Sequence, residues 1–217
     1  MEGLFSLLLL LLLSFVAVFF HLIRILFNSP VDFSMDWNLF LSWIPLIIAF
    51  FADNFTKRFG KIPVVLILLS VVWLAFFPNA PYMITDLAHL TVDYERDLTW
   101  HDVIMLFFYA EVSLFNGLVS LYWIHRSWRR IFNRVTSNSF LLASLPLAGF
   151  GVYLGRVRRM NSWDIIHDPQ LILKNLLESA MDRTALVFSM EIGMLLGILY
   201  LVLWVIVRFR IRYNRKS

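Results

Sequence analysis

Six long apolar segments divide this chain, and they constrain its fold more than any other feature. A transmembrane helix needs about 20 mostly apolar residues, or about 17 at the short end. The expected membrane-spanning helices cover residues 4–27, 37–51, 62–77, 102–124, 140–154 and 185–209. The sequence therefore predicts an all-α, polytopic transmembrane bundle of about six spans, which forms one integral membrane domain over residues 1–217.

The composition agrees with a membrane location. Hydrophobic residues make up 60% of the chain and charged residues only 16%, whereas a soluble domain carries about 25% charged residues. The chain contains no cysteine, which excludes disulfides, thiolate metal sites and cysteine nucleophiles. The net charge of +4 does not indicate nucleic-acid binding, because the basic residues of a membrane protein mostly set its topology.

The Lys and Arg residues between the expected spans are unevenly distributed. More of them lie on the side that carries both chain termini. The positive-inside rule therefore places both termini in the cytoplasm, and we expect a multi-pass protein of the bacterial cytoplasmic membrane. The last outer loop is an exception, because it carries Arg156, Arg158 and Arg159. A functional use of these arginines would explain the exception, as would a segment that does not span.

Three ionisable side chains fall inside the expected spans. Glu111 lies near the midplane of the fourth span, Glu191 in the outer half of the sixth, and Arg24 near the outer end of the first. Charges inside a bilayer are costly, and they mark functional sites by default. These residues either form buried ion pairs between helices or line a polar cavity that opens to the outer face. We expect the cavity.

A proline-rich stretch follows the third span, and residues 76–90 read FFPNAPYMITDLAHL. Pro78 and Pro81 should end the helix, because proline lacks an N–H and clashes with the preceding turn. A short helix is expected next, on the outer face. Asn79 and Tyr82 are candidate residues for binding a substrate or an anion there.

The same stretch offers a candidate catalytic pair. Asp86 and His89 are three residues apart, so they face the same way on a helix. They could act as an acid–base pair, or hold Zn²⁺ together with further ligands. The pair alone is a weak signal, so we assign no metal site and leave any cofactor open.

A second outer-face stretch, residues 149–164, reads GFGVYLGRVRRMNSWD. Arginine grips phosphate or carboxylate with a planar fork, so Arg156 and Arg159, with Asn161 and Asp164, could bind a lipid headgroup or another anionic ligand. Alternatively, the arginines reach to the membrane interface or pair with nearby carboxylates. We expect the two outer-face stretches to lie side by side.

Residues 168–182 alternate leucines with polar residues and predict an amphipathic helix along the outer membrane surface. Small residues recur four apart in the last two spans, at Gly151 and Gly155 and at Gly193 and Gly197. Glycines at this spacing let helix backbones approach closely, so we assign them to helix packing.

The motifs resemble a bacterial membrane-protein family that is catalogued as domain of unknown function 1361. The matching pieces are residues 77–82, 85–87, 89–90, 151–156 and 161–164. The pattern of helices around them also matches, so the resemblance covers most of the chain. It implies a multi-pass bacterial membrane protein with two outer-face motifs, and it implies no reaction.

Three functions remain open at this point. The first is an envelope binding or assembly protein with a polar site on the extracytoplasmic face, and this is the one we expect. The second is a membrane enzyme that acts on a lipid-linked or phosphorylated substrate. The third is a small proton- or cation-coupled transporter that uses Glu111 and Glu191, although broken helices at the midplane, which favour transport, are few. The expected partners are the bilayer and a lipid headgroup or envelope protein, with the oligomeric state left open.

Overall fold

The computed structural model describes residues 2–26, 34–60, 62–88, 100–160 and 167–214. All regular secondary structure in these ranges is helical, which confirms the predicted all-α class. The helices are α1 (Glu2–Leu26), α2 (Ser34–Phe59), α3 (Pro63–Phe76), α4 (Asn79–Tyr82), the 3-10 helix η1 (Met83–Ala88), α6 (Trp100–Ile131), α7 (Arg134–Arg156), α9 (Pro169–Met181) and α10 (Arg183–Asn214).

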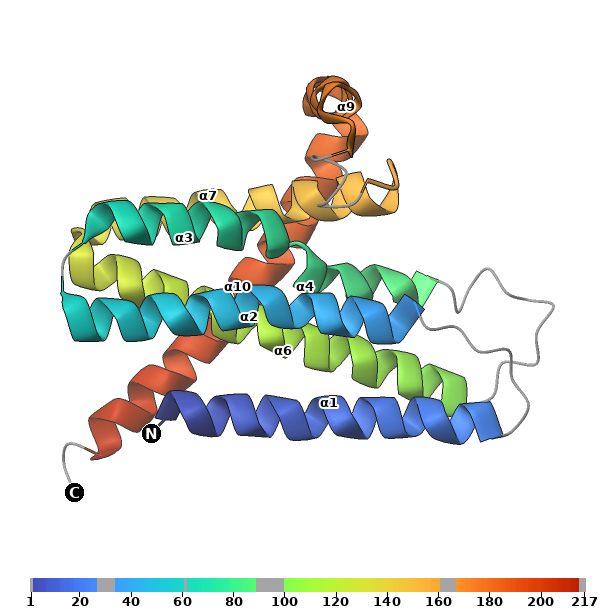
Figure 1. Cartoon of the computed structure of the whole chain (residues 1–217), viewed down its shortest axis with the longest axis horizontal. Helices are drawn as coiled ribbons and strands as arrows, with labels where there is room; N and C mark the ends of the chain where they lie inside the picture. The colour runs from blue at the N-terminus through green and yellow to red at the C-terminus, as the bar shows by residue number, and fades with distance from the viewer. Residues whose placement is uncertain (1, 27–33, 61, 89–99, 161–166, 215–217) are drawn as a thin grey trace.

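Six helical stretches of the described chain are long and apolar enough to cross a membrane. The helices α1, α2, α3, α6 and α7 run along the long axis of the molecule, and α10 crosses them obliquely (Figure 1). α1 begins at the same end of the bundle at which α10 ends (Figure 1). We call this the terminal end and the opposite one the far end.

The third span does not stop where the sequence analysis placed its end. α3 has only 14 residues, or about 21 Å at 1.5 Å per residue, which is short of the roughly 30 Å hydrocarbon core. The chain continues through α4 and η1, so that the apolar stretch reaches from Pro63 to Ala88. The predicted range 62–77 was therefore too short, and the proline-rich stretch lies within the bundle.

Two central helices extend beyond their predicted ranges, 37–51 and 102–124. α2 continues to Phe59 and α6 to Ile131. Their additional turns carry polar side chains that pair with each other, since Arg126 Nε of α6 donates to Asp53 Oδ1 of α2 at 2.9 Å. The sequence pattern ended these helices where the apolar run ended, whereas the ion pairs carry them further.

α7 also begins earlier than its predicted range, 140–154. Its first turn starts at Arg134 because the Asn133 side chain caps it. Asn133 Oδ1 accepts a 2.8 Å hydrogen bond from the backbone N–H of Thr136, which satisfies one of the free N–H groups at a helix start.

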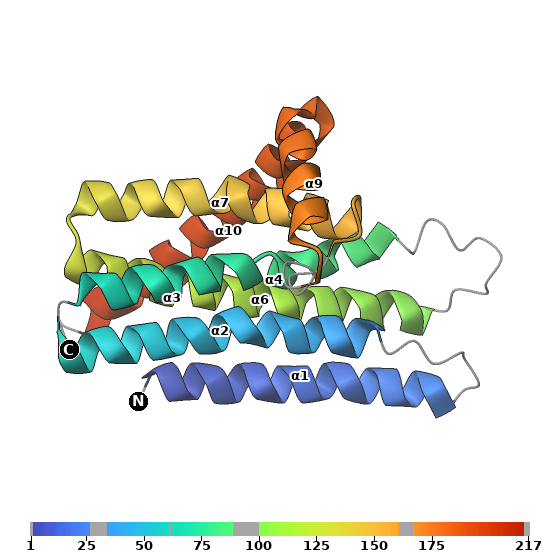
Figure 2. The same ribbon diagram turned by 45° about the horizontal axis from the view of Figure 1, so that its top comes forward.

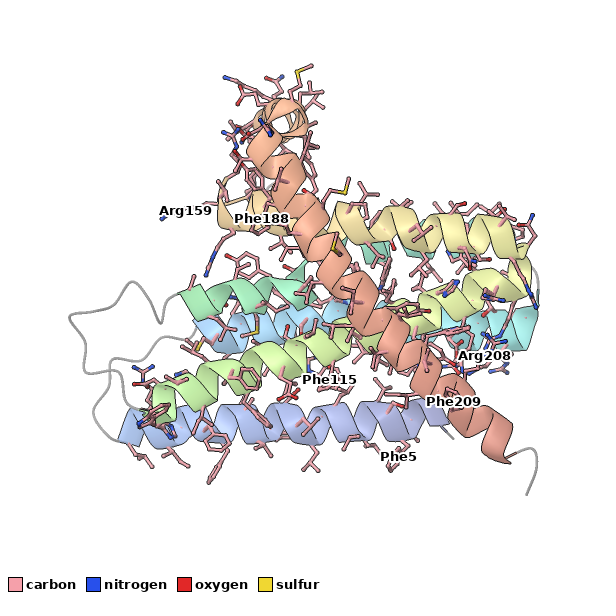
Figure 3. All side chains as sticks on the ribbon, turned by 180° about the vertical axis from the view of Figure 1, so that it is seen from behind. Phe5, Phe115, Arg159, Phe188, Arg208 and Phe209 are labelled. Atoms are coloured by element: carbon pink, nitrogen blue, oxygen red, sulfur yellow. The ribbon has the colours of Figure 1, made fainter. Side chains whose placement is uncertain are left out.

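The glycines of α7 and α10 lie where helices approach closely. A Cβ atom on Gly149 would lie 2.4 Å from the backbone oxygen of Ser189, and one on Gly193 would lie 3.0 Å from the nitrogen of Pro146. These contacts hold α10 against α7 as it crosses the bundle (Figure 3). The predicted packing role is confirmed here, while Gly151 contacts the proline-rich stretch instead.

α9 matches the predicted amphipathic helix 168–182. It stands beside the main bundle, next to the start of α10 (Figure 2). Its side chains Leu171, Leu173, Leu177 and Met181 are all exposed. An exposed apolar face of this kind fits a helix that lies in the membrane interface.

Candidate functional site

The break at Pro78 and Pro81 packs against the middle of the 32-residue helix α6. Ser113 Oγ of α6 donates a 2.8 Å hydrogen bond to the carbonyl oxygen of Ala80. Gly117 makes room one turn further along, since a Cβ atom there would lie only 2.8 Å from the Cβ of Ala80. The break is therefore fixed at depth in the bundle by one hydrogen bond and one close contact.

The other side of the break contacts α7. A Cβ atom on Gly151 would lie 2.3 Å from Cγ of Pro78, closer than real side chains approach. A Cβ atom on Gly155 would lie 3.1 Å from the Tyr82 ring. The proline-rich stretch and the start of the second outer-face stretch, which we expected to lie side by side, are thus in direct contact. The two glycines make this close contact possible.

The polar side chains of the break satisfy its backbone. Asn79 Nδ2 donates to the carbonyl oxygen of Phe76 at 2.9 Å, and Thr85 Oγ1 donates to that of Tyr82 at 2.6 Å. These two carbonyls flank the prolines, with Phe76 before Pro78 and Tyr82 after Pro81, and carbonyl groups away from water need such partners. Asn79, a candidate binding residue by sequence, therefore supports the local backbone.

Arg156 at the end of α7 pairs with Asp86 of η1. Its Nη1 lies 2.8 Å from Asp86 Oδ1, its Nη2 donates to the carbonyl oxygen of Thr85, and its Cζ lies 5.4 Å from the centre of the Tyr82 ring. The other carboxylate oxygen accepts from Asn38 Nδ2 at 3.4 Å. The Asp86 side chain is only 8% exposed. Both groups of the pair are therefore committed to joining η1, α7 and α2.

The two arginines that follow are differently placed. Arg158 Nε donates to Ser179 Oγ at 3.2 Å, and its Nη1 lies 3.9 Å from Glu178 Oε2. Arg159 is exposed, and no other described residue forms a hydrogen bond or ion pair with it. It projects outward beyond the end of α7 (Figure 3). Of the three motif arginines, Arg159 is therefore the one whose guanidinium has no partner among the described residues and is free to bind a ligand.

The backbone at Arg159 is also unusual, since its φ is 54°. This is the left-handed region, which non-glycine residues seldom adopt. Strained residues of this kind cluster at binding sites, where the surrounding structure maintains them. The conformation directs the Arg159 side chain away from the helix that ends before it.

A cavity of about 250 Å³ lies beside these arginines, between the end of α7 and the start of α9. Its lining combines two arginines, a histidine, an asparagine and one carboxylate with apolar side chains. The lining residues are Arg158, Arg159, Met160, His167, Asp168, Leu171, Ile172 and Asn175. This combination suits an anion that carries an apolar portion.

A second polar cluster connects α1, α2 and α6 near the far end. Asp36 accepts from Tyr109 Oη at 2.5 Å and lies 2.9 Å from His21 Nδ1. Arg24 Nε lies 2.7 Å from Asp102 Oδ1. Arg24 was expected near this end of the first span, whereas Asp36 falls just outside the predicted second span and was counted as a loop charge. Tyr109, its partner, was not a candidate residue.

The other intramembrane carboxylates do not join this cluster. Glu111 is half-buried on a face of α6 whose neighbours Phe107 and Phe115 are exposed. Glu191 is exposed on α10. Among the described residues no hydrogen bond or ion pair connects Arg24, Glu111 and Glu191, so the polar cavity expected from them stays a prediction.

Three predicted site residues, His89, Asn161 and Asp164, lie outside the described residues. The pairing of Asp86 with His89 therefore stays a prediction. Within the described ranges, no three His, Cys, Asp or Glu side chains come together as a metal site would require.

A family model described as "Protein of unknown function (DUF1361)" matches residues 37–199. The chain belongs to this family. In this DUF1361 protein both motifs, the Arg156–Asp86 pair and the cavity fall within the matched residues. No curated protein and no solved structure matches the chain significantly. The family resemblance is thus confirmed, and it brings no activity with it.

Proposed function

We propose that this DUF1361 protein is an envelope binding protein that holds a phosphate-bearing, anionic lipid in the cavity beside Arg158 and Arg159. The cavity itself carries the proposal, because it combines about 250 Å³ of space with apolar side chains and two arginines. Its one carboxylate, Asp168, accepts a hydrogen bond from the backbone N–H of Leu171 as the cap of α9. With the termini in the cytoplasm, as the basic residues predict, the ligand would bind from the extracytoplasmic side.

Different residues of the cavity would bind the phosphate and the acyl chain of the lipid. The guanidinium of Arg159 is exposed, and arginine binds phosphate oxygens through two parallel N–H groups. His167 and Asn175 add further donors, while Leu171 and Ile172 offer a surface for an acyl chain. The exposed side chains of Leu173 and Leu177 add further apolar surface on the same helix.

Binding is a better account of the site than acid–base catalysis. A catalytic Asp86 would need a carboxylate oxygen available to substrate, yet one oxygen meets Arg156 and the other meets Asn38. The pair instead supports the end of α7, from which Arg158 and Arg159 follow. Asp86 and Arg156 thus position the site without touching the ligand.

Lipid binding to the purified protein tests this proposal. Native mass spectrometry in neutral detergent can count phosphatidylglycerol molecules bound to the wild type, to Arg159→Gln and to a control variant, Lys174→Gln. Like Arg159, Lys174 is an exposed cation; it lies on α9 and does not line the cavity. A hydrogen bond to a charged group is worth about 1.5–3 kcal/mol, so Arg159→Gln should weaken one binding event by at least about tenfold.

The control should bind as the wild type does. Phosphatidylcholine, which has no net charge, should not replace phosphatidylglycerol in the wild type. Equal phosphatidylglycerol binding by wild type and Arg159→Gln would refute the proposed site, and equal losses in both variants would reduce it to general charge attraction.

A further inference from the structure

A buried carboxylate near the terminal end is surrounded by three cations. Asp53 of α2 has a side chain that is only 4% exposed. Arg126 reaches both of its oxygens, with Nε 2.9 Å from Oδ1 and Nη2 2.5 Å from Oδ2. Arg130 Nη1 lies 2.7 Å from Oδ1, and Lys57 Nζ lies 2.5 Å from Oδ2. We call these four residues the Asp53 cluster.

The three cations of the cluster carry more positive charge than the single Asp53 carboxylate can neutralise. The two-pronged contact with Arg126 already pairs both carboxylate oxygens, and this is the strongest arrangement available to a carboxylate. Lys57 and Arg130 therefore leave two positive charges uncompensated. Their side chains are 44% and 29% exposed, so both reach the surface of the bundle.

These cations are close enough to repel each other. Lys57 Nζ and Arg126 Nη2 each lie 2.5 Å from the same oxygen of Asp53, so they are at most about 5 Å apart. Arg130 uses one nitrogen, Nη1, for the Asp53 carboxylate, the Asp53 carbonyl and Thr56 Oγ1. Its Nε and Nη2 bond to no other described residue, and they remain donors for an additional anion.

The cluster lies at the depth of lipid headgroups. Lys57 is in the last turn of α2, and Arg130 is in the last turn of α6. Helices that span a membrane leave the hydrocarbon near their ends. Four more arginines are exposed at this end and contact no carboxylate among the described residues; they are Arg58, Arg129, Arg134 and Arg208, the last of which is labelled in Figure 3.

We propose that Lys57 and Arg130, held in place with Arg126 on Asp53, bind the headgroup phosphate of an anionic phospholipid in the leaflet at the terminal end. Asp53 holds the three cations together, and the phosphate neutralises the charge that Asp53 leaves over. Basic pockets between transmembrane helices bind anionic headgroups in this way. The site is separate from the cavity beside Arg159, because it is formed by α2 and α6 at the opposite end.

The same lipid-counting measurement distinguishes the two sites by the variants used. The full chain, purified in neutral detergent, is titrated with phosphatidylglycerol as wild type, Lys57→Gln, Arg130→Gln and the double variant. Each basic residue near a membrane surface contributes about fivefold in affinity. Each single variant should therefore weaken one binding event by about fivefold and the double variant by about 25-fold, while the event lost in Arg159→Gln is unchanged.

The matched control is Arg134→Gln, which removes an exposed cation from the same end without touching the Asp53 cluster. Its affinity should change less than twofold. An equal loss in Arg134→Gln and Arg130→Gln would overturn the site in favour of diffuse charge attraction, as would full binding by the double variant. Competition by millimolar inorganic phosphate without preference for phosphatidylglycerol over phosphatidylcholine would overturn the lipid as its ligand.

Should Arg130→Gln fail to fold, Lys57→Gln alone decides the matter. Lys57 is the most exposed cation of the cluster, and its removal leaves both arginines on Asp53. Circular dichroism of each variant checks that the helices are intact. Wild-type affinity in a folded Lys57→Gln variant would contradict the proposal.

Discussion

The contact between Gly151 and Pro78 offers the sharpest test of how the two motifs fit together. A methyl group on Gly151 would lie 2.3 Å from Pro78 Cγ and 2.8 Å from its Cβ. An ordinary contact needs about 1 Å more, and the rigid proline ring is followed by the buried Ala80 and Pro81. Overpacking of this kind costs about 1–3 kcal/mol, and the better helix propensity of alanine offsets up to about 1 kcal/mol.

We therefore expect Gly151→Ala to lower the free energy of unfolding by about 1–2 kcal/mol, measured by titration with a denaturing detergent. The matched control is Gly197→Ala. Its new methyl group would lie 3.3 Å from Cδ1 of Leu145, the end of a flexible side chain, so this variant should be neutral or slightly more stable. Equal stability of the two variants would refute the proposed packing of the proline-rich stretch against α7.

Two further predictions concern the carboxyl groups of Asp86 and Asp182. Asp86→Asn or Arg156→Gln alone should lower the free energy of unfolding by about 3 kcal/mol, because each leaves a largely buried partner uncompensated. The double variant should lose much less stability than the sum of the two single losses, and additive losses would contradict the pairing. The backbone N–H of Thr184, followed by the hydroxyl of Tyr153, lowers the pKa of the Asp182 carboxyl below its ordinary value of 3.8. Wild type should therefore exceed Asp182→Asn in stability above pH 3.8 and lose this advantage as the pH falls through the lowered pKa of the folded state; a gap that is constant with pH would refute the assignment.

The broad fold follows from the sequence, because apolar length alone defines six helical stretches. The position of the proline-rich stretch does not follow from it. Two prolines predict that a helix stops, so the residues that follow them were expected outside the membrane, on the outer face. In the structure, Ser113 donates to the carbonyl oxygen of Ala80 and Asn79 to that of Phe76, so side chains supply hydrogen bonds to the backbone around the prolines. The chain therefore stays within the bundle.

The candidate site was predicted in part. The sequence presents Arg156 and Arg159 as equivalent members of one motif, and only the folded chain distinguishes them. The contact of Gly155 with Tyr82 brings Arg156 to Asp86, whereas Arg159 lies past the end of the helix. A pairing across 70 residues depends on tertiary packing that no local pattern encodes.

The Asp53 cluster was missed altogether, although a signal was present. Asp53 and Lys57 are four residues apart, as are Arg126 and Arg130, so each pair shares one helix face. The predicted spans ended before these residues, the three cations were treated as loop charges that set topology, and Asp53 was not considered. Extending both helices by two turns would have placed them within reach of each other.

The most direct test of the proposed ligand site is the Arg159→Gly variant. Glycine adopts the φ of 54° without strain, so the unfolding free energy should stay within about 1 kcal/mol of wild type. Phosphatidylglycerol binding in the cavity should nevertheless fall at least about tenfold. A folded Arg159→Gly protein that retains this lipid with wild-type affinity would contradict the account.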